Sequence, residues 1–119
     1  MSRIDLGRLG EALAEKHLEG LGYSIIARNH RSALGELDLV GREGDCWVFV
    51  EVKTRRSQRC GIGAEAVTAR KQARLVRLAQ QFMGQQGARS AACRFDVIDV
   101  YLPPGAAPEI RHIRGAFGE

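Results

Sequence analysis

Cysteine, proline and tryptophan are scarce in this sequence, which has three cysteines, three prolines and one tryptophan among 119 residues. The cysteines are an odd number, and no two of them have the C-x-x-C spacing. Such a pattern is typical neither of a disulfide framework nor of a zinc site. We therefore expect Cys46, Cys60 and Cys93 to be reduced side chains that behave as small apolar groups.

Long hydrophobic runs are also absent. No stretch reaches the roughly 18 apolar residues that a membrane-spanning helix needs. The amino-terminal residues 1–9 carry Arg3, Asp5 and Arg8 and lack the apolar core of a secretory signal. We therefore expect no membrane partner and a cytoplasmic location. Because 45% of the residues are hydrophobic, the chain can bury one core, and we expect residues 1–119 to form a single domain.

Lysine is scarce as well, since only three of the 18 basic residues are lysines. The basic residues concentrate between positions 53 and 77, where Glu65 is the only acidic residue. A basic zone of this kind is typical of a protein that binds a phosphate backbone. Two alternatives remain, namely an arginine content that reflects a GC-rich coding sequence and a solvated face without function. The zone contains Lys53, Arg55, Arg56, Arg59, Arg70, Lys71, Arg74 and Arg77.

Hydrophobic periodicity and turn residues predict a compact α/β domain. The segment 29–33 is expected to be irregular, and the segment 109–113 to add an edge strand. The second predicted helix places Arg70, Arg74 and Arg77 at positions i, i+4 and i+7, which share one helix face. The predicted order is helix, three strands, helix and strand, over residues 5–21, 23–27, 34–41, 46–54, 68–83 and 95–102.

The second and third predicted strands form a hairpin that brings charged residues together. If residues 44–45 form a two-residue turn, Asp38 lies opposite Glu51, and Glu36 lies opposite Lys53. Because side chains alternate along a strand, these four residues project from one face of the sheet. A one-residue bulge would change this register. The other face is expected to carry the apolar residues Leu37, Leu39, Val48, Val50 and Val52.

Two carboxylates opposite each other on neighbouring strands repel and destabilise a sheet. A cation between Asp38 and Glu51 would remove this repulsion. Magnesium is a hard ion that takes oxygen ligands, commonly one or two carboxylates together with water and substrate phosphate. The alternative is that each acid lies on a solvated face, with Glu36 and Lys53 forming an ordinary cross-strand ion pair.

The segments 35–40 (GELDLV) and 49–55 (FVEVKTR) make the sequence recognisable. They resemble the widespread bacterial YraN-like family of uncharacterised proteins, which is similar to a branch of the PD-(D/E)XK nuclease superfamily close to archaeal Holliday-junction resolvases. The resemblance extends from G-x-x-G-E-x-x-A at residues 7–14, through RFDV at 94–97, to the Ala116-Phe117 pair. It implies a restriction-endonuclease-like core around a central mixed sheet.

The resemblance implies a role for several residues. Asp38 and Glu51 match the metal-binding acids, and Glu11 matches an additional helix glutamate of the metal site. Lys53 matches the lysine that orients the attacking water and offsets charge on the phosphate. Lys71 matches a lysine of the second helix that contacts the nucleic-acid backbone. The proline that usually precedes the catalytic aspartate is replaced by Leu37, a position at which the superfamily varies.

These residues lead to a first hypothesis and two alternatives. The first is a magnesium-dependent endonuclease, with manganese as the other candidate ion, that cuts structured or branched DNA. One alternative is a nucleic-acid-binding module that keeps the nuclease fold without catalysis, and the other is a subunit whose basic face binds an acidic protein. By analogy with resolvases, the protein is expected to form a homodimer. The residues expected to bind nucleic acid are Arg55, Arg56, Arg70, Lys71 and Arg74.

Overall fold

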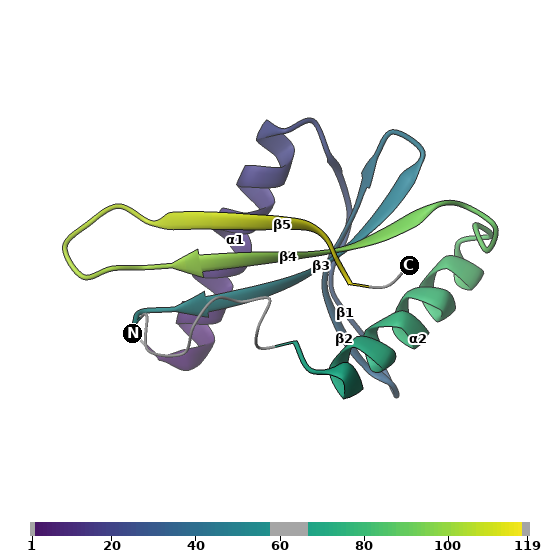
Figure 1. The fold of residues 1–119 in the computed structure, drawn as a ribbon, viewed down its shortest axis with the longest axis horizontal. Helices are drawn as coiled ribbons and strands as arrows, with labels where there is room; N and C mark the ends of the chain where they lie inside the picture. Colours follow the sequence, from purple (N-terminus) through teal and green to yellow (C-terminus); the bar gives the residue numbers. More distant parts are fainter. Residues whose placement is uncertain (1, 58–66, 118–119) are drawn as a thin grey trace.

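The computed structural model describes residues 2–57 and 67–117. Five strands form one mixed sheet in the order β1-β2-β3-β4-β5 (Figure 1). Neighbouring strands are antiparallel except for β3 and β4, which are parallel. The elements are α1 (Arg3–Gly20), β1 (Ser24–Ser32), β2 (Gly35–Glu43), β3 (Cys46–Arg55), α2 (Ala69–Gln85), β4 (Cys93–Tyr101) and β5 (Glu109–Phe117).

This element order confirms the predicted restriction-endonuclease-like α/β core. The α2 helix lies between the parallel strands β3 and β4 along the chain, which makes a β-α-β unit. The predicted edge strand at 109–113 is part of β5, which continues to Phe117. Neither helix of the described chain is long and apolar enough to cross a membrane.

The α1 helix packs unusually close to the sheet. Its first turn is capped by Ser2, whose hydroxyl accepts a hydrogen bond from the backbone N–H of Asp5 at 3.1 Å. Gly10, Ala14 and Leu18 form its buried stripe at helical spacing. A Cβ atom at position 10 would lie 1.8 Å from Oγ1 of Thr54, so only glycine allows the helix backbone to touch β3 at this point.

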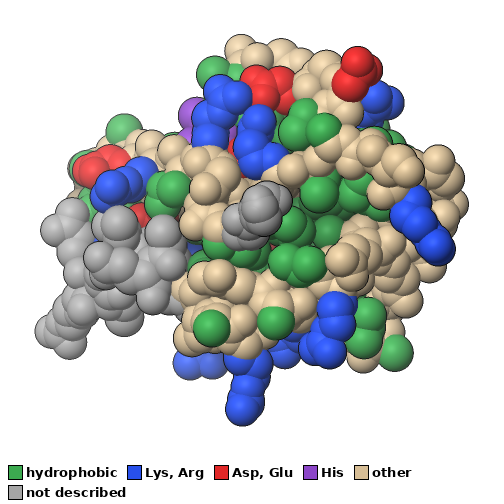
Figure 2. All heavy atoms as spheres, turned by 45° about the vertical axis from the view of Figure 1, so that its right-hand side comes forward, with side chains coloured by type: hydrophobic (Ala, Val, Ile, Leu, Met, Phe, Trp, Pro, Cys, Tyr) green, Lys and Arg blue, Asp and Glu red, His purple; other side chains and the backbone are tan. Residues whose placement is uncertain are grey.

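The α2 helix covers the other face of the sheet. Thr68 caps its first turn by accepting a hydrogen bond from the backbone N–H of Lys71 at 3.2 Å. Beyond the carboxyl-terminal half of α2, hydrophobic side chains are visible at the bottom of a hollow in the surface, with Lys and Arg side chains near its margins (Figure 2). The buried side of the helix consists of Leu75, Leu78, Ala79, Phe82 and Met83.

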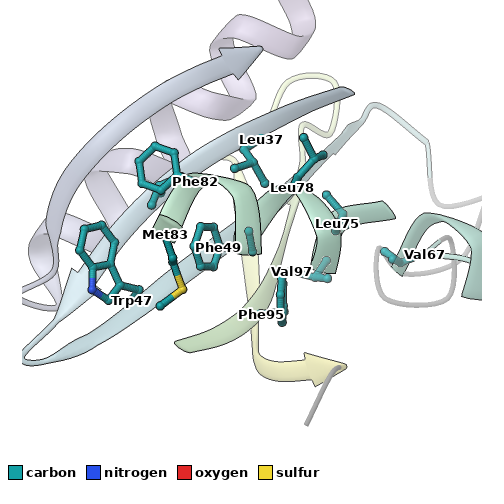
Figure 3. Close-up of a cluster of buried hydrophobic side chains, with 12 residues drawn as sticks. Leu37, Trp47, Phe49, Val67, Leu75, Leu78, Phe82, Met83, Phe95 and Val97 are labelled. Atoms are coloured by element: carbon teal, nitrogen blue, oxygen red, sulfur yellow. The ribbon is translucent and has the colours of Figure 1, made fainter. Parts of the chain in front are cut away.

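The sheet separates two hydrophobic clusters. On the α1 side, Leu39, Val48 and Val50 pack with Ala14 and Leu18. On the α2 side, aromatic rings fill most of the space, and Phe82 lies edge-on to both Trp47 and Phe49 (Figure 3). The α2-side cluster contains Leu37, Val40, Trp47, Phe49, Val67, Leu75, Leu78, Ala79, Phe82, Met83, Phe95 and Val97.

The hairpin register agrees with the prediction over the ladder that the two strands form. Glu43 pairs with Cys46 across the turn at residues 44–45, and the pairing continues to Leu39 and Val50. The prediction of an irregular segment at 29–33 is wrong, because β1 extends to Ser32 and pairs with β2 as far as Gly35.

The predicted placement of Leu37 is also wrong. Leu37 belongs to the α2-side cluster, whereas Leu39, two residues later, belongs to the α1-side cluster. The regular alternation of faces is therefore interrupted at Asp38. In β1, Asn29 lies between the residues that pair with Leu37 and Leu39, and its φ of 48° places it in the left-handed region. This kink in the neighbouring strand explains the change of face.

Candidate active site

The site lies where β2 and β3 stop pairing. The backbone pairing of β2 and β3 ends at Leu39 and Val50. The next contact between the strands is made by a side chain, since Oδ2 of Asp38 accepts a hydrogen bond from the backbone N–H of Val52 at 2.9 Å. This bond holds the Asp38 carboxylate beside the β3 segment that carries Glu51. Glu51 is 7% exposed, and both of its neighbours on the strand, Val50 and Val52, pack in the α1-side cluster. The two acids are thus held together in largely dry surroundings.

The electrostatics of Asp38 show that this arrangement is unfavourable for a bare carboxylate. Burial and the neighbouring charge of Glu51 raise the pKa of Asp38 to about 7, although the Val52 hydrogen bond lowers it. Glu11 and Glu36 raise it further. Desolvation and like charges both disfavour the ionised form of an acid. Near neutral pH, Asp38 is therefore poised between its two protonation states.

A third acid approaches from α1. Burial raises the pKa of Glu11, and the charges of Glu36 and Glu51 act in the same direction. A hydrogen bond from the Asn29 side chain acts against this shift. Three elements, α1, β2 and β3, therefore contribute carboxylates whose charges influence one another.

The donor set fits a hard divalent cation better than a soft one. Within residues 2–57 and 67–117, no three His, Cys, Asp or Glu side chains are arranged closely enough to enclose an ion by themselves. Magnesium does not require such a cage, because it is commonly held by one or two carboxylates, water and substrate phosphate. The Asp38 and Glu51 pair meets this smaller requirement, and the repulsion that raises the pKa of Asp38 is the feature that a cation would relieve.

Two lysines converge on Glu51. Nζ of Lys53 lies 3.4 Å from Oε2 of Glu51, and the ammonium of Lys71 contacts the same oxygen from α2. Burial and contact with Lys71 lower the pKa of Lys53, which Glu51 partly opposes. Burial would also lower the pKa of Lys71, but its hydrogen bonds to Glu51 and Lys53 raise it. Glu51 is therefore paired with two cations when no other ligand is present.

A groove gives access to these groups from solvent. Asp38, Glu51 and Lys71 line one part of it, together with Glu36 and Arg74. Glu36 also lines the adjoining part, which extends past Glu11 to the amino-terminal end of α1. The acids therefore lie along an open groove that runs from one helix to the other, rather than in a closed cavity.

The family of the chain follows from its sequence relatives. The model of the family described as "Uncharacterised protein family UPF0102" matches residues 10–100. The chain belongs to this family. This confirms the prediction of an uncharacterised, YraN-like bacterial family.

The matches to UPF0102 proteins extend over nearly the whole chain. The UPF0102 protein of Geotalea daltonii is 46% identical over 112 residues, which cover 94% of this chain and 88% of that protein. The one from Symbiobacterium thermophilum is 47% identical over 112 residues, covering 94% and 95%. The one from Caldicellulosiruptor saccharolyticus is 46% identical over 118 residues, covering 98% and 100%. The matches therefore cover most of the length of each pair of chains.

Some basic residues of this UPF0102 chain have an acidic partner among the described residues, and others have none there. Arg55 belongs to the first group, because its guanidinium lies 2.8 Å from Oδ2 of Asp99 and 5.0 Å from the centre of the Tyr101 ring. Arg56, Arg70 and Arg74 are exposed. Arg59, the remaining member of the predicted basic zone near them, lies outside the described residues. The assignment of these residues to nucleic-acid binding stays a prediction.

Sequence reasoning missed two features of the UPF0102 site. Asn29 was assigned to an irregular segment, yet it lies in β1 and its side chain contacts Glu11. An asparagine tolerates positive φ better than most residues, and this is the signal that points to such a position. Lys71 was expected to contact a nucleic-acid backbone, and the structure places its ammonium on Glu51. Nothing in the local sequence indicates that contact, because it depends on where α2 crosses the sheet.

Proposed function

We propose that this protein is a metal-dependent endonuclease that hydrolyses phosphodiester bonds in structured or branched DNA. The observation that carries the proposal is the pair of adjoining carboxylates, Asp38 and Glu51, which share a buried site with Lys53 and Lys71. A pure binding surface gains nothing from two acids that repel each other and would repel phosphate. Strongly perturbed carboxylates in a groove are typical of catalytic sites.

The proposed metal is magnesium, and manganese has the same ligand preference for oxygen. Asp38 and Glu51 would hold the ion, and Glu11, which does not form one close cluster with them, would act on it from α1 through a water ligand. When bound, the ion supplies Lewis-acid stabilisation of the phosphate and lowers the pKa of a bound water.

The remaining residues have roles that follow from their charge and position. In the hydrolysis, a water oxygen bonds to phosphorus, the ester bond to the leaving sugar oxygen breaks, and that oxygen gains a proton. Lys53 lies beside the acids and would stabilise the negative charge that develops on the phosphate. Arg70 and Arg74, on α2, would hold flanking phosphates, which position the substrate without reading its sequence. Arg55, Arg56 and Lys71 are proposed to contribute to the same positive surface.

A different observation favours a second candidate, a nucleic-acid-binding module without catalysis. Glu51 is already neutralised by Lys53 and Lys71, so the site is partly compensated without an ion. If this pairing persists when DNA binds, the acids would have only a structural role.

Cleavage of a nucleic-acid panel separates the two candidates. Branched, single-stranded and duplex substrates are incubated with magnesium, manganese or a chelator, and binding is measured in parallel. For an endonuclease we expect metal-dependent cleavage that falls by about a hundredfold or more in Lys53→Met, while DNA affinity changes little. Asp38→Asn is expected to lose cleavage and to bind DNA at least as tightly, because a negative charge facing phosphate is removed. If the wild type cleaves none of these substrates with either metal and both variants bind as it does, the binding module is the correct function.

A further inference from the structure

A second hollow lies at the carboxyl-terminal half of α2, away from the acids. The helix supplies Arg77 and Met83, and the loop to β4 and the start of that strand supply Arg89, Ala91 and Cys93. Figure 2 shows the molecule with this end turned forward, and both hydrophobic and basic side chains are exposed on that face. The cavity has a volume of about 700 Å³, which is within the range of small-molecule binding sites.

The lining combines an apolar floor with a polar, cationic rim. Met83, which is buried, and Ala91, which is half-buried, provide the floor, and the exposed Cys93 lies at its edge. The thioether of methionine and the thiol of cysteine are polarisable groups that pack well against the face of an aromatic ring. Arg77 and Arg89 provide the rim, and Gln80 and Gln81 add side-chain amides that can both donate and accept hydrogen bonds.

The two rim arginines are available for a ligand. Within residues 2–57 and 67–117, neither Arg77 nor Arg89 forms an ion pair, and no acidic side chain lines the hollow. Other arginines of the fold, such as Arg28 with Glu15, are held by carboxylates. The Arg89 guanidinium lies beside the helix at Gly84, where a terminal nitrogen is 3.5 Å from the position a Cβ atom would take, which is ordinary van der Waals contact.

These features match the chemistry of one ligand class. A nucleotide has a flat base that packs on an apolar floor, base edges that exchange hydrogen bonds with amides, and a phosphate that a guanidinium binds through two parallel bonds. A base that is paired within a duplex cannot lay its face on such a floor, so the nucleotide must be unpaired. The geometry therefore points to an unpaired nucleotide of the substrate as the occupant, and this inference rests on the proposed function.

The spacing along α2 places this nucleotide relative to the acids. Lys71 contacts Glu51, and Gln81 lines the distal hollow. At about 1.5 Å per residue, the ten positions between them span about 15 Å. At about 3.4 Å per nucleotide along a strand, this distance corresponds to about four nucleotides. The preferred substrate then has a single-stranded segment that begins within about four nucleotides of the cleaved bond.

Binding measured with a chelator present tests the inference without requiring cleavage. The probes are a fluorescent duplex with blunt ends and the same duplex with a short single-stranded tail, on either the 5′ or the 3′ end. We expect the wild type to bind one tailed duplex about tenfold more tightly than the blunt one, the effect usual for one well-packed base. Arg89→Ala should abolish this preference. Arg111→Ala, which removes an exposed charge on β5, should weaken both probes equally and keep the preference.

A second pair of variants separates the hollow from any role of Arg89 in stabilising the end of α2. Gln81→Glu is nearly isosteric and introduces a charge that repels phosphate, whereas Gln85→Glu introduces the same charge on α2 outside the lining. Only Gln81→Glu should remove the preference, and both should keep the thermal stability of the wild type. The inference is overturned if the wild type has no preference for either tail, or if the preference survives in both Arg89→Ala and Gln81→Glu. If the preference for a tailed duplex is lost in these two variants but the wild type cleaves no substrate, the inference stands and the nuclease proposal fails.

Discussion

Two aspartates in the same sheet have opposite surroundings. Asp96 in β4 is fully buried and accepts hydrogen bonds from Arg94, His112 and the backbone N–H of Gly115 at distances from 2.7 to 3.1 Å. Burial would raise its pKa, but these bonds lower it below the usual range. Asp38 accepts one backbone hydrogen bond and faces other carboxylates, and its pKa is raised to about 7. The fold stabilises the charge of the first aspartate and compensates that of the second only in part.

The comparison teaches how to separate structural acids from functional ones. Asp96 is fully buried and Asp38 half-buried, but burial raises the pKa of both carboxyls, so burial alone does not explain the opposite shifts. What differs is the partner set, because the hydrogen bonds to Asp96 link β4 to β5 and stabilise the folded chain. The charge of Asp38 costs stability, and a fold keeps such a cost where a ligand or substrate later removes it. Three experiments test this contrast, and a fourth tests a corresponding contrast between arginines.

The largest expected effect is the loss of stability when Asp96 is removed. Asp96→Ala leaves the half-buried guanidinium of Arg94 without one of its two carboxylate partners, and breaking an ion pair whose carboxylate is buried costs about 3–5 kcal/mol. Urea denaturation measures the change, with Asp45→Ala in the exposed turn as the control. Equal stability of the two variants would show that the Asp96 network contributes nothing.

Replacing Asp38 should have the opposite effect on stability to replacing Asp96. Because its pKa is higher in the folded protein than the ordinary 3.8, the folded state binds the proton more tightly than the unfolded state does. The unfolding free energy of the wild type should therefore fall as the pH rises from about 4 to about 7. Asp38→Asn removes this dependence and should be more stable than the wild type at pH 8 by about 1–3 kcal/mol. Urea titrations at pH 4 and pH 8 measure it, and a variant less stable than the wild type at pH 8 contradicts the expectation.

Magnesium should stabilise the folded wild type by offsetting the negative charge of Asp38, and it should have no such effect in Asp38→Asn. At ten times its dissociation constant, a ligand that binds only the folded state adds about 1.4 kcal/mol to the unfolding free energy. We expect a rise in melting temperature with magnesium at pH 7, reversed by chelator and absent in Asp38→Asn. An equal rise in both proteins would place the ion elsewhere.

The smallest expected effect is on the salt dependence of DNA binding, in which an arginine held by a carboxylate should differ from exposed arginines on α2. Arg70→Ala and Arg74→Ala should each reduce the slope of log affinity against log salt by about one on duplex DNA. Arg28→Ala removes a guanidinium that already lies on Glu15, so its slope should stay close to that of the wild type. The contrast fails if the Arg28 variant changes the slope as much as the others do.

Much of the fold could be predicted from local sequence, because the alternation in β3 and the turn at residues 44–45 determine the hairpin register without distant contacts. The face of Leu37 could not be predicted in this way. It depends on the kink at Asn29 in the neighbouring strand, which is a property of the sheet and not of β2 alone.

The candidate site divides in a similar way. Asp38, Glu51 and Lys53 could be placed together because they lie on one hairpin. The contact between Lys71 and Glu51 depends on how α2 packs on the sheet, and the pairing of Arg55 with Asp99 depends on the register of the parallel strands. Both contacts join residues that are far apart in the chain, and hydrophobic periodicity carries no information on such contacts.

The close approach of Gly10 to Thr54 has a mechanical consequence for the site. Glu11 follows the first of these residues in α1, and Lys53 precedes the second in β3. Only the short Thr54 side chain lies between the helix backbone and the strand here, and this tight contact resists sliding of one element over the other. Any movement of the end of β3 on substrate binding must therefore carry Glu11 along as part of one rigid body, and the spacing between these two charges is preserved.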